Sequence, residues 1–184
     1  MDYIATYPNC FIRYHASDMI LSIDSDAAYL VLPGARSRIA GYYHLTRIPT
    51  PSSPPFLNAP ILVECKTLRH VVSSAAEAET SATFHNAQQA IHIRQILHHL
   101  GHKQPPTPLK VDNSTTNGFV HNNINQKRSK SWDMRYHWLR DKETQKEINV
   151  YWDKGTNNLA DYYTKHHTAP YHRKIRSLYI RDKT

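Results

Sequence analysis

Apolar and strand-forming residues gather in three stretches in the first part of the chain. Residues 19–23, 38–45 and 61–67 are rich in β-branched, aromatic and leucine side chains. A Pro-Gly pair at 33–34 marks a turn between the first two stretches, and five prolines and two serines in residues 49–60 indicate a loop before the third. The pattern predicts three successive strands, arranged as an antiparallel meander.

The longest periodic segment follows these strands. Between residues 84 and 100, apolar side chains recur mostly at three- and four-residue steps, which is typical of an amphipathic helix. Ser73 and Ser74 are N-cap candidates, and Glu77 stands three residues after Ser74, as in a capping box. Gly101 is a natural end for the helix.

Shorter strand and helix patterns alternate after the long helix. These elements are expected at residues 109–111, 113–122, 128–146, 148–152 and 158–165. Strands that are separated by helices add in parallel through right-handed crossovers. The sequence therefore predicts an α/β domain with a mixed five-stranded sheet, in which three strands are antiparallel and two are added in parallel, with helices on both faces.

Composition indicates a basic, polar protein. The 184 residues carry a formal charge of +8, the pI is near 9.5 and the mean hydropathy is -0.64. Such an excess of positive charge favours a polyanionic partner, most often nucleic acid, although a basic protein without such a partner has the same composition. Two cysteines imply no disulfide framework. We expect no membrane partner and an intracellular location, in the cytoplasm or the nucleus, because neither a membrane span nor a signal pattern occurs.

Four carboxylates lie where predicted strands end or helices begin. Asp26 follows the first strand, Glu79 lies in the first turns of the long helix, Asp112 leaves the strand at 109–111, and Asp161 opens the last helix. Ligands of α/β sheets bind at the carboxyl ends of the strands, so this topology brings the four acids to one edge. Converging carboxylates repel each other unless a divalent cation lies between them, which predicts a metal-dependent nuclease.

Each of these acids also has an ordinary explanation as a turn residue, a helix cap or a first-turn acid. Asp24 competes with Asp26, because it lies on the same strand face two residues earlier. Glu77 competes with Glu79 in the same way. Small neighbours allow the Glu79 stripe of the helix to approach the sheet closely; they are Ala75, Ala76, Ala82 and Thr83.

Histidine is unusually frequent, with 13 residues. Two groups stand out, at 98–102 and 166–172. Neither cysteine lies near them, which argues against a structural zinc site, and a zinc-binding interaction domain is a further alternative. His166 and His167, close to Asp161, are candidates for proton transfer.

Five blocks carry a family resemblance. They are SDAAY at 25–29, SSAAEAE at 73–79, VDNS at 111–114, KSWDMRYH at 130–137 and LADYYTK at 159–165. In this order they resemble the motifs of the ribonuclease H domain of copia-type LTR retrotransposon pol polyproteins. The resemblance implies a ribonuclease H-like fold, catalytic and metal-binding acids at Asp26, Glu79, Asp112 and Asp161, and two Mg²⁺ ions, for which Mn²⁺ can substitute. It thereby prefers Asp26 over Asp24 and Glu79 over Glu77.

The implied substrate is an RNA–DNA hybrid whose RNA strand is hydrolysed endonucleolytically. Residues 1–17 resemble the end of the connection from a reverse transcriptase domain, to which such a domain is normally fused, so the chain is expected to be a C-terminal fragment of a polyprotein. Residues 18–167 form the ribonuclease H-like domain, and residues 168–184 a basic tail. The sequence departs from the family at Thr80 and at 131–132, which leaves a catalytically decayed nucleic-acid-binding module as the alternative.

Basic residues in the helical segment at 128–146 are candidates for contacts with nucleic-acid phosphates. They are Arg128, Lys130, Arg135, Arg140 and Lys142. Acids are interleaved with them, so a solvated helix face is an equal alternative.

Overall fold

A mixed sheet forms the centre of the protein. The structure, a computed structural model, describes residues 2–48, 57–121 and 130–182. Within these ranges the sheet has five strands in the order β4-β3-β2-β5-β6, and they are β2 (Ile20–Leu32), β3 (Arg36–Thr46), β4 (Pro60–Thr67), β5 (Thr107–Val111) and β6 (Ile148–Trp152). The first three pair antiparallel, while β5 joins β2 and β6 joins β5 in parallel. The predicted sheet is thereby confirmed; most of the proline-rich loop lies outside the described residues.

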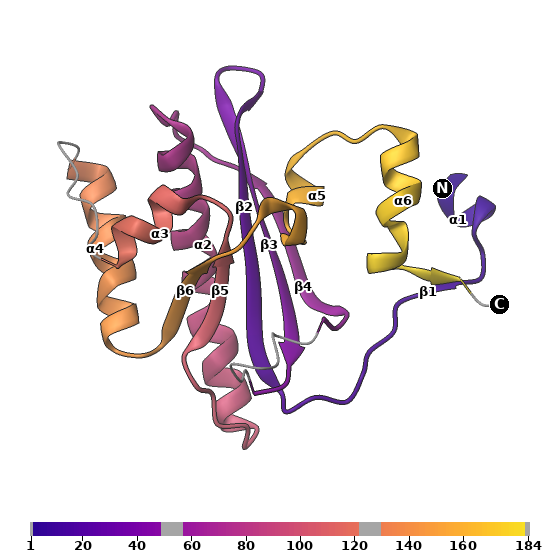
Figure 1. Ribbon diagram of the computed structural model, residues 1–184, viewed down its shortest axis with the longest axis horizontal. Helices are drawn as coiled ribbons and strands as arrows, with labels where there is room; N and C mark the ends of the chain where they lie inside the picture. The colour runs from indigo at the N-terminus through magenta and orange to yellow at the C-terminus, as the bar shows by residue number, and fades with distance from the viewer. Residues whose placement is uncertain (1, 49–56, 122–129, 183–184) are drawn as a thin grey trace.

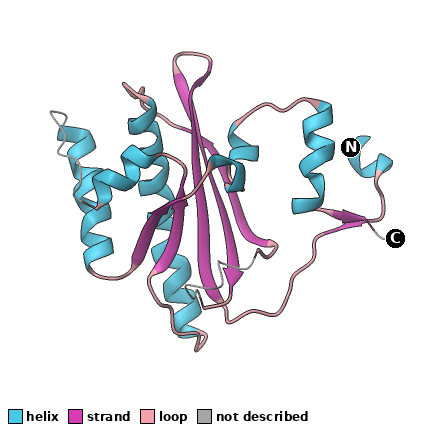
Figure 2. Ribbon diagram, viewed as in Figure 1, coloured by secondary structure: helices cyan, strands magenta, loops and turns pink. Residues whose placement is uncertain are grey.

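Helices cover both faces of this sheet, as predicted (Figures 1 and 2). On one face lie α2 (Ala75–His99), α3 (Ser114–Val120) and α4 (Lys130–Thr144), and on the other lie α5 (Asp161–Thr164) and α6 (Ala169–Tyr179). The helix predicted at 158–165 is shorter in the structure: α5 covers Asp161–Thr164, and a short 3-10 helix, η1 (Gly155–Asn157), and a turn precede it. No described helix is long and apolar enough to cross a membrane.

Segments near the two ends of the chain lie together, apart from the central sheet (Figure 1). A short helix, α1 (Asp2–Thr6), precedes β1 (Cys10–Phe11), which pairs antiparallel with β7 (Arg181–Asp182). The guanidinium of Arg176 in α6 stacks over the ring of Tyr7 at 4.4 Å. The basic C-terminal segment, for which no element was expected, therefore contains a helix and a strand.

The central strand β2 has two different faces. Leu21 and Ile23 are fully buried and pack in one apolar cluster with Ala87 and Ala90 of α2. The alternate residues carry polar side chains, including Asp24 and Asp26, toward the face of α5. Because side chains alternate along a strand, one short segment supplies both the apolar core and a buried polar surface.

The start of α2 assigns different roles to its two glutamates. The Ser74 hydroxyl accepts a hydrogen bond from the Glu77 backbone N–H at 3.1 Å, as predicted for an N-cap. The Glu77 carboxylate accepts from the backbone N–H and the hydroxyl of Ser73, both at 2.7 Å. Glu77 therefore caps the helix, and Glu79 is left to point toward the sheet.

A close approach fixes α2 against β2 and β3. The Asn86 side-chain amide donates to Ser25 Oγ and to the Ala40 carbonyl, each at 2.8 Å, and Asn86 Oδ1 accepts from the Tyr43 hydroxyl at 2.9 Å. A Cβ atom added at Gly41 would lie 2.5 Å from Asn86 Oδ1. Only glycine therefore leaves room for this polar contact between helix and sheet.

Gly41→Ala is expected to lower the free energy of unfolding by about 1–3 kcal/mol, because the added methyl group overpacks the contact with Asn86. Urea denaturation followed by circular dichroism measures the change. Gly34→Asn is the matched control: Gly34 has φ +70 and no atom near its Cβ position, and asparagine tolerates that conformation. Equal stability of Gly41→Ala and the wild type would contradict the close approach.

Candidate active site

Three aspartates from separate elements meet at one edge of the sheet. Asp26 lies on β2, Asp112 directly follows β5, and Asp161 is the first residue of α5. One carboxylate oxygen from each lies within 4.8 Å of the other two. We call these three residues the acidic cluster; in the described part of the chain it is the one group of three acidic, histidine or cysteine side chains with such spacing. Asp26 was expected to follow its strand, but β2 continues beyond it to Leu32. The parallel pairing of β2 with β5 at Asp24 and Lys110 brings Asp26, within β2, beside the carboxyl end of β5.

Glu79 lies beside the acidic cluster, although it is not one of the three. Its side chain is buried, and its Oε1 accepts from the Ala27 backbone N–H at 3.2 Å, one residue beyond Asp26. Its Oε2 is buried without a hydrogen-bond partner among the described residues. Burial, and then the negative charges of Asp26 and Asp112, raise the pKa of Glu79 well above its ordinary value.

The aspartates of the cluster lack full charge compensation. Burial raises the pKa of Asp26 to about 6, and the charges of Asp112 and Asp161 add to this effect. The Thr164 hydroxyl, which donates a hydrogen bond to Asp26, and the charge of Lys165 act in the opposite direction. Burial, followed by the charge of Asp161, also raises the pKa of Asp112. A bound cation would stabilise the ionised form of each group.

Lys165 is the basic side chain of this site. Its ammonium group donates a hydrogen bond to Asp161 Oδ1, one helical turn earlier. Burial lowers the pKa of Lys165, but this hydrogen bond and the charges of Asp26, Asp161 and Asp112 raise it overall. Lys165 belongs to the block LADYYTK but has no expected role from the sequence; its i,i+4 spacing from Asp161 is the signal that points to this ion pair.

The loop between β6 and α5, residues 153–160, presses against Asp112. A Cβ atom added at Gly155 would lie 2.8 Å from Asp112 Oδ2. The Trp152 indole N–H donates to the Asp112 carbonyl at 2.9 Å, and the Asp153 backbone N–H donates to the Val111 carbonyl at 3.0 Å. The absence of a side chain at Gly155 therefore leaves room for the Asp112 carboxylate in this position.

The predicted phosphate-binding residues have different surroundings. Arg128 lies outside the described residues, and Lys130 begins α4, but its side chain is also outside the description. Arg135 Nη1 donates to Ser81 Oγ on α2 at 3.4 Å. Arg140 donates to the Tyr136 hydroxyl, and Lys142 forms an ion pair with Glu147 at 3.2 Å. Among the three predicted phosphate-binding residues whose side chains are described, Arg135 is the one with a hydrogen bond to α2, the helix that carries Glu79.

A groove lined in part by basic side chains lies between β4, α2 and α4. Its volume is about 390 Å³. We call it the basic groove, after the basic residues in its lining: Lys66, Arg69, His70, His85 and Arg135. Ser81 of α2 also lines it, two residues from Glu79. Of these basic residues, only Arg135 was expected from the sequence to bind phosphates. The others lie on β4, on the loop after it and on α2, far from Arg135 in the sequence.

The two candidate proton-transfer histidines have different positions. His167 Nε2 lies 3.1 Å from the Tyr162 carbonyl, and its ring stacks on the rings of Tyr162 and Tyr171 at 5.0 and 4.6 Å. His166 is exposed. Within the described residues neither histidine group gathers three metal-binding side chains, so this part of the structure offers no support for the zinc reading.

Comparisons with known proteins extend the resemblance. No protein-family model matches the chain. Over 110 residues, or 60% of the chain, it is 27% identical to the Retrovirus-related Pol polyprotein from transposon TNT 1-94 of Nicotiana tabacum, and it spans 8% of that protein. The whole polyprotein is therefore much longer than this chain.

Solved structures of ribonucleases H resemble the fold. LC11-RNase H1 in complex with an RNA/DNA hybrid is 9% identical, with a TM-score of 0.55 over 78% of this chain and 92% of that chain. The N-terminal RNase H domain of a Mycobacterium tuberculosis protein, solved as a fusion with maltose binding protein, is 12% identical, with a TM-score of 0.55 over 79% and 91%. The chain therefore has the ribonuclease H fold and distantly matches, over 60% of its length, the Pol polyprotein of a copia-type retrotransposon.

Proposed function

We propose that the protein is a metal-dependent ribonuclease H, which cuts the RNA strand of an RNA–DNA hybrid endonucleolytically. The observation that carries this proposal is the acidic cluster, formed by Asp26 within β2, Asp112 after β5 and Asp161 at the start of α5, with Glu79 beside it. Such a group of uncompensated acids would be unfavourable in a purely structural role, whereas it is the usual ligand set for hard divalent cations.

The residues present fit Mg²⁺. All four side chains offer carboxylate oxygens, and Glu79 Oε2 is buried without a partner among the described residues. Two Mg²⁺ ions, or Mn²⁺ in their place, would activate the attacking water and stabilise negative charge on the scissile phosphate and the leaving oxygen. Burial, and then the neighbouring negative charges, raise the pKa values of Asp26, Glu79 and Asp112, and a bound cation would offset both effects by stabilising the ionised carboxylates.

The chain's own groups hold this site in place. The Thr164 hydroxyl orients the Asp26 carboxylate, and the Ala27 N–H orients Glu79. Lys165 partly neutralises the acidic cluster and, from the same position, can attract a phosphate of the substrate. His166 and His167 are proposed to transfer protons during cleavage, and His166 is the more accessible of the two.

The basic groove supports a nucleic-acid partner. One of its lining residues, Ser81, belongs to the helix that carries Glu79, and we propose that a nucleic-acid strand bound in the groove extends from there to the acids. Binding to phosphates is independent of base sequence, and discrimination between RNA and DNA would depend on the 2′-hydroxyl and on the shape of the duplex. The structural relative LC11-RNase H1 was solved with an RNA/DNA hybrid, in agreement with this substrate class. Lys130, Arg140, Lys142 and Arg128 are proposed as further phosphate contacts.

We also infer that the protein acts as part of a longer Pol polyprotein beside a reverse transcriptase. The match to the TNT 1-94 polyprotein, of which the chain spans 8%, supports this context. Residues 1–17 are proposed to connect the two domains, residues 18–167 to form the nuclease domain and residues 168–184 to form its basic extension.

Asp112→Asn is expected to lower Mg²⁺-dependent cleavage of a labelled RNA–DNA hybrid by more than about 100-fold, because it removes a charged metal ligand. Denaturing gels with either strand labelled measure the rate and show whether the DNA strand is spared. Asp141→Asn, on the exposed face of α4, is the control and should cut normally. A wild-type protein that binds the hybrid without cutting it would instead identify the catalytically decayed module.

Stability should depend on pH in opposite ways with and without metal. Burial raises the pKa of Asp26 from its ordinary value of 3.8 to about 6 in the folded protein, so the folded state holds an extra proton between these values. The stabilisation that comes from the raised pKa of Asp26 is therefore fully present below about pH 4 and is lost as the pH rises through about 6. Mg²⁺ binds the ionised carboxylates, so it should raise the melting temperature more at about pH 7 than at about pH 5.

Thermal unfolding in EDTA and in Mg²⁺ over this range tests both trends. Asp26→Asn, which cannot ionise, should show a weaker pH dependence in EDTA and a smaller response to Mg²⁺. A Mg²⁺ response that does not change with pH would argue against metal binding by carboxylates of raised pKa.

Arg69→Gln/Arg135→Gln should weaken hybrid binding and reduce the slope of log affinity against log salt by about 1 to 2, because each lost phosphate contact contributes about 0.9 to that slope. Fluorescence anisotropy with a labelled hybrid, in Ca²⁺ to suppress cleavage, gives both quantities. The control Arg173→Gln/Lys174→Gln removes the same charge from the exposed surface of α6. An equal loss of slope in both variants would show only non-specific attraction to positive charge.

A further inference from the structure

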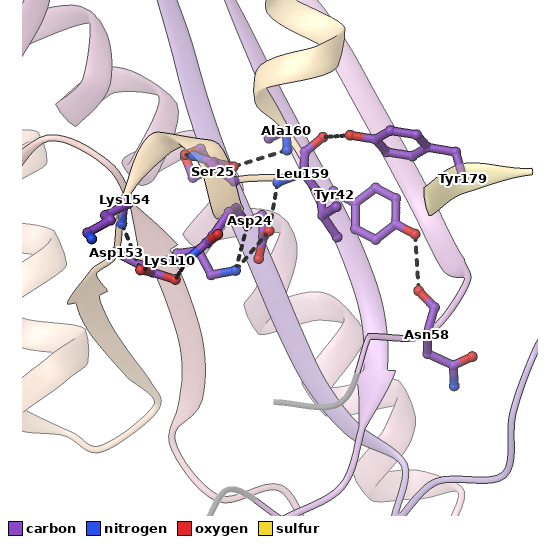
Figure 3. A network of polar contacts seen from close by, with 12 residues as sticks. Asp24, Ser25, Tyr42, Asn58, Lys110, Asp153, Lys154, Leu159, Ala160 and Tyr179 are labelled. Atoms are coloured by element: carbon purple, nitrogen blue, oxygen red, sulfur yellow. Dashed lines mark hydrogen bonds and ion pairs between the residues drawn. The ribbon is translucent and has the colours of Figure 1, made fainter. Parts of the chain in front are cut away.

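Asp24 is a buried carboxylate that the proposed chemistry does not use. It lies on the same face of β2 as Asp26, but outside the acidic cluster. Its side chain is 1% exposed, and its Oδ2 accepts two hydrogen bonds, from the Leu159 backbone N–H at 2.9 Å and from Lys110 Nζ at 3.2 Å (Figure 3). Leu159 lies two residues before Asp161, so Asp24 contacts the chain that leads into the site.

Lys110 holds the same loop at a second point. It lies on β5, in register with Asp24 of β2. Its ammonium group donates to the Asn157 carbonyl at 3.1 Å as well as to Asp24. Asp24 and Lys110, which we call the positioning pair, thus bind Leu159 and Asn157 of the loop that connects β6 to α5.

Asn158, between these two residues, adds a third connection to β2. Its side-chain amide donates to the Ser25 carbonyl at 2.8 Å, and its Oδ1 accepts from the Ala160 N–H at 3.0 Å. The Asp161 N–H donates to the Asn158 carbonyl at 3.3 Å. The start of α5 is therefore located by contacts to β2 immediately before Asp26, on the strand that supplies the cluster's first acid.

The positioning pair is a poor source of stability. Asp24 Oδ1 is buried and has no partner in the described part of the chain, and burial raises the pKa of Asp24 despite the opposing charge of Lys110. Replacing a buried ion pair with apolar side chains of similar size is often neutral or stabilising. What apolar side chains cannot supply is the acceptor for the Leu159 N–H and the donor to the Asn157 carbonyl.

We propose that Asp24 and Lys110 are positioning residues: together they fix the β6–α5 loop so that Asp161 reaches Asp26 and Asp112. This inference rests on the proposed metal site for its effect on cation binding, but its effect on the loop is independent of that site. Groups that orient metal ligands typically contribute 10–100-fold to metal affinity, so the consequence should be measurable.

Asp24→Leu/Lys110→Met removes both charges and both contacts to the loop without leaving an unpaired charge. Asp24→Asn is the conservative variant, since its side-chain oxygen still accepts from the Leu159 N–H. Hydrogen–deuterium exchange of peptides covering residues 155–165 reports on the loop in metal-free protein, and isothermal titration calorimetry with MgCl₂ reports on the site. We expect faster exchange in the double variant and Mg²⁺ affinity lower by about 10–100-fold, with both close to wild type in Asp24→Asn.

Leu97→Ala controls for a general loss of stability. Leu97 is buried near the end of α2 that is remote from Glu79, and its truncation should destabilise the domain by about 2–5 kcal/mol. It should leave the Mg²⁺ affinity and the ordering of residues 155–165 relative to the rest of the domain unchanged. If the apolar double variant does not fold, Asp24→Asn/Lys110→Met is the second variant: it loses the contact between Lys110 and residue 24 and, of the two contacts to the loop, only the one to Asn157, so it should show an intermediate increase in exchange.

Wild-type exchange and wild-type Mg²⁺ affinity in the apolar double variant would overturn the proposal. So would equal effects in Leu97→Ala. If the wild-type protein itself binds no Mg²⁺, the proposed function fails, while the exchange experiment still decides whether the positioning pair holds the loop.

Discussion

Repulsion among partly buried carboxylates is the constraint that the rest of this structure has to overcome. Asp26, Asp112 and Asp161 come from separate parts of the chain, and no local interaction favours their meeting. The parallel pairing of β2 with β5 brings the first two together, and the loop after β6 adds the third. Burial raises the pKa of Asp26, and the charges of Asp112 and Asp161 add to this effect, so the ionised form of Asp26 is disfavoured in the folded protein. The framework around them must therefore be rigid.

That rigidity comes from the two faces of β2. On one face, apolar packing and the Asn86 amide, which fits against Gly41, hold α2 close to the sheet. This contact sets the depth of Glu79, because a helix further from the sheet could not present Glu79 to the Ala27 N–H. On the other face, the β6–α5 loop is bound to β2 by hydrogen bonds to polar groups. The same strand thus locates Glu79 through packing and Asp161 through hydrogen bonds.

The sequence predicts the strands and the long helix in their order along the chain, because hydrophobic periodicity and helix caps are local signals. It also predicts that Asp26, Asp112 and Asp161 come together. Alternation along a strand cannot separate Asp24 from Asp26, since both lie on one face. For Glu77 the capping-box spacing was informative, and the structure confirms the cap. The basic groove and the pairing of β1 with β7 were beyond prediction, because they join residues far apart in sequence through short or irregular segments.

Two acids of the same type acquire different roles here because of strand register. The pairing of β2 and β5 places Asp24 beside Lys110, and two residues further along both strands Asp26 meets Asp112. A shift of two residues would preserve the inward and outward alternation of side chains. It would nevertheless place Asp26 beside Lys110, replacing a site that attracts cations with an internal ion pair. In the observed register Lys110 lies beside Asp24, so the acidic cluster has no internal lysine from β5.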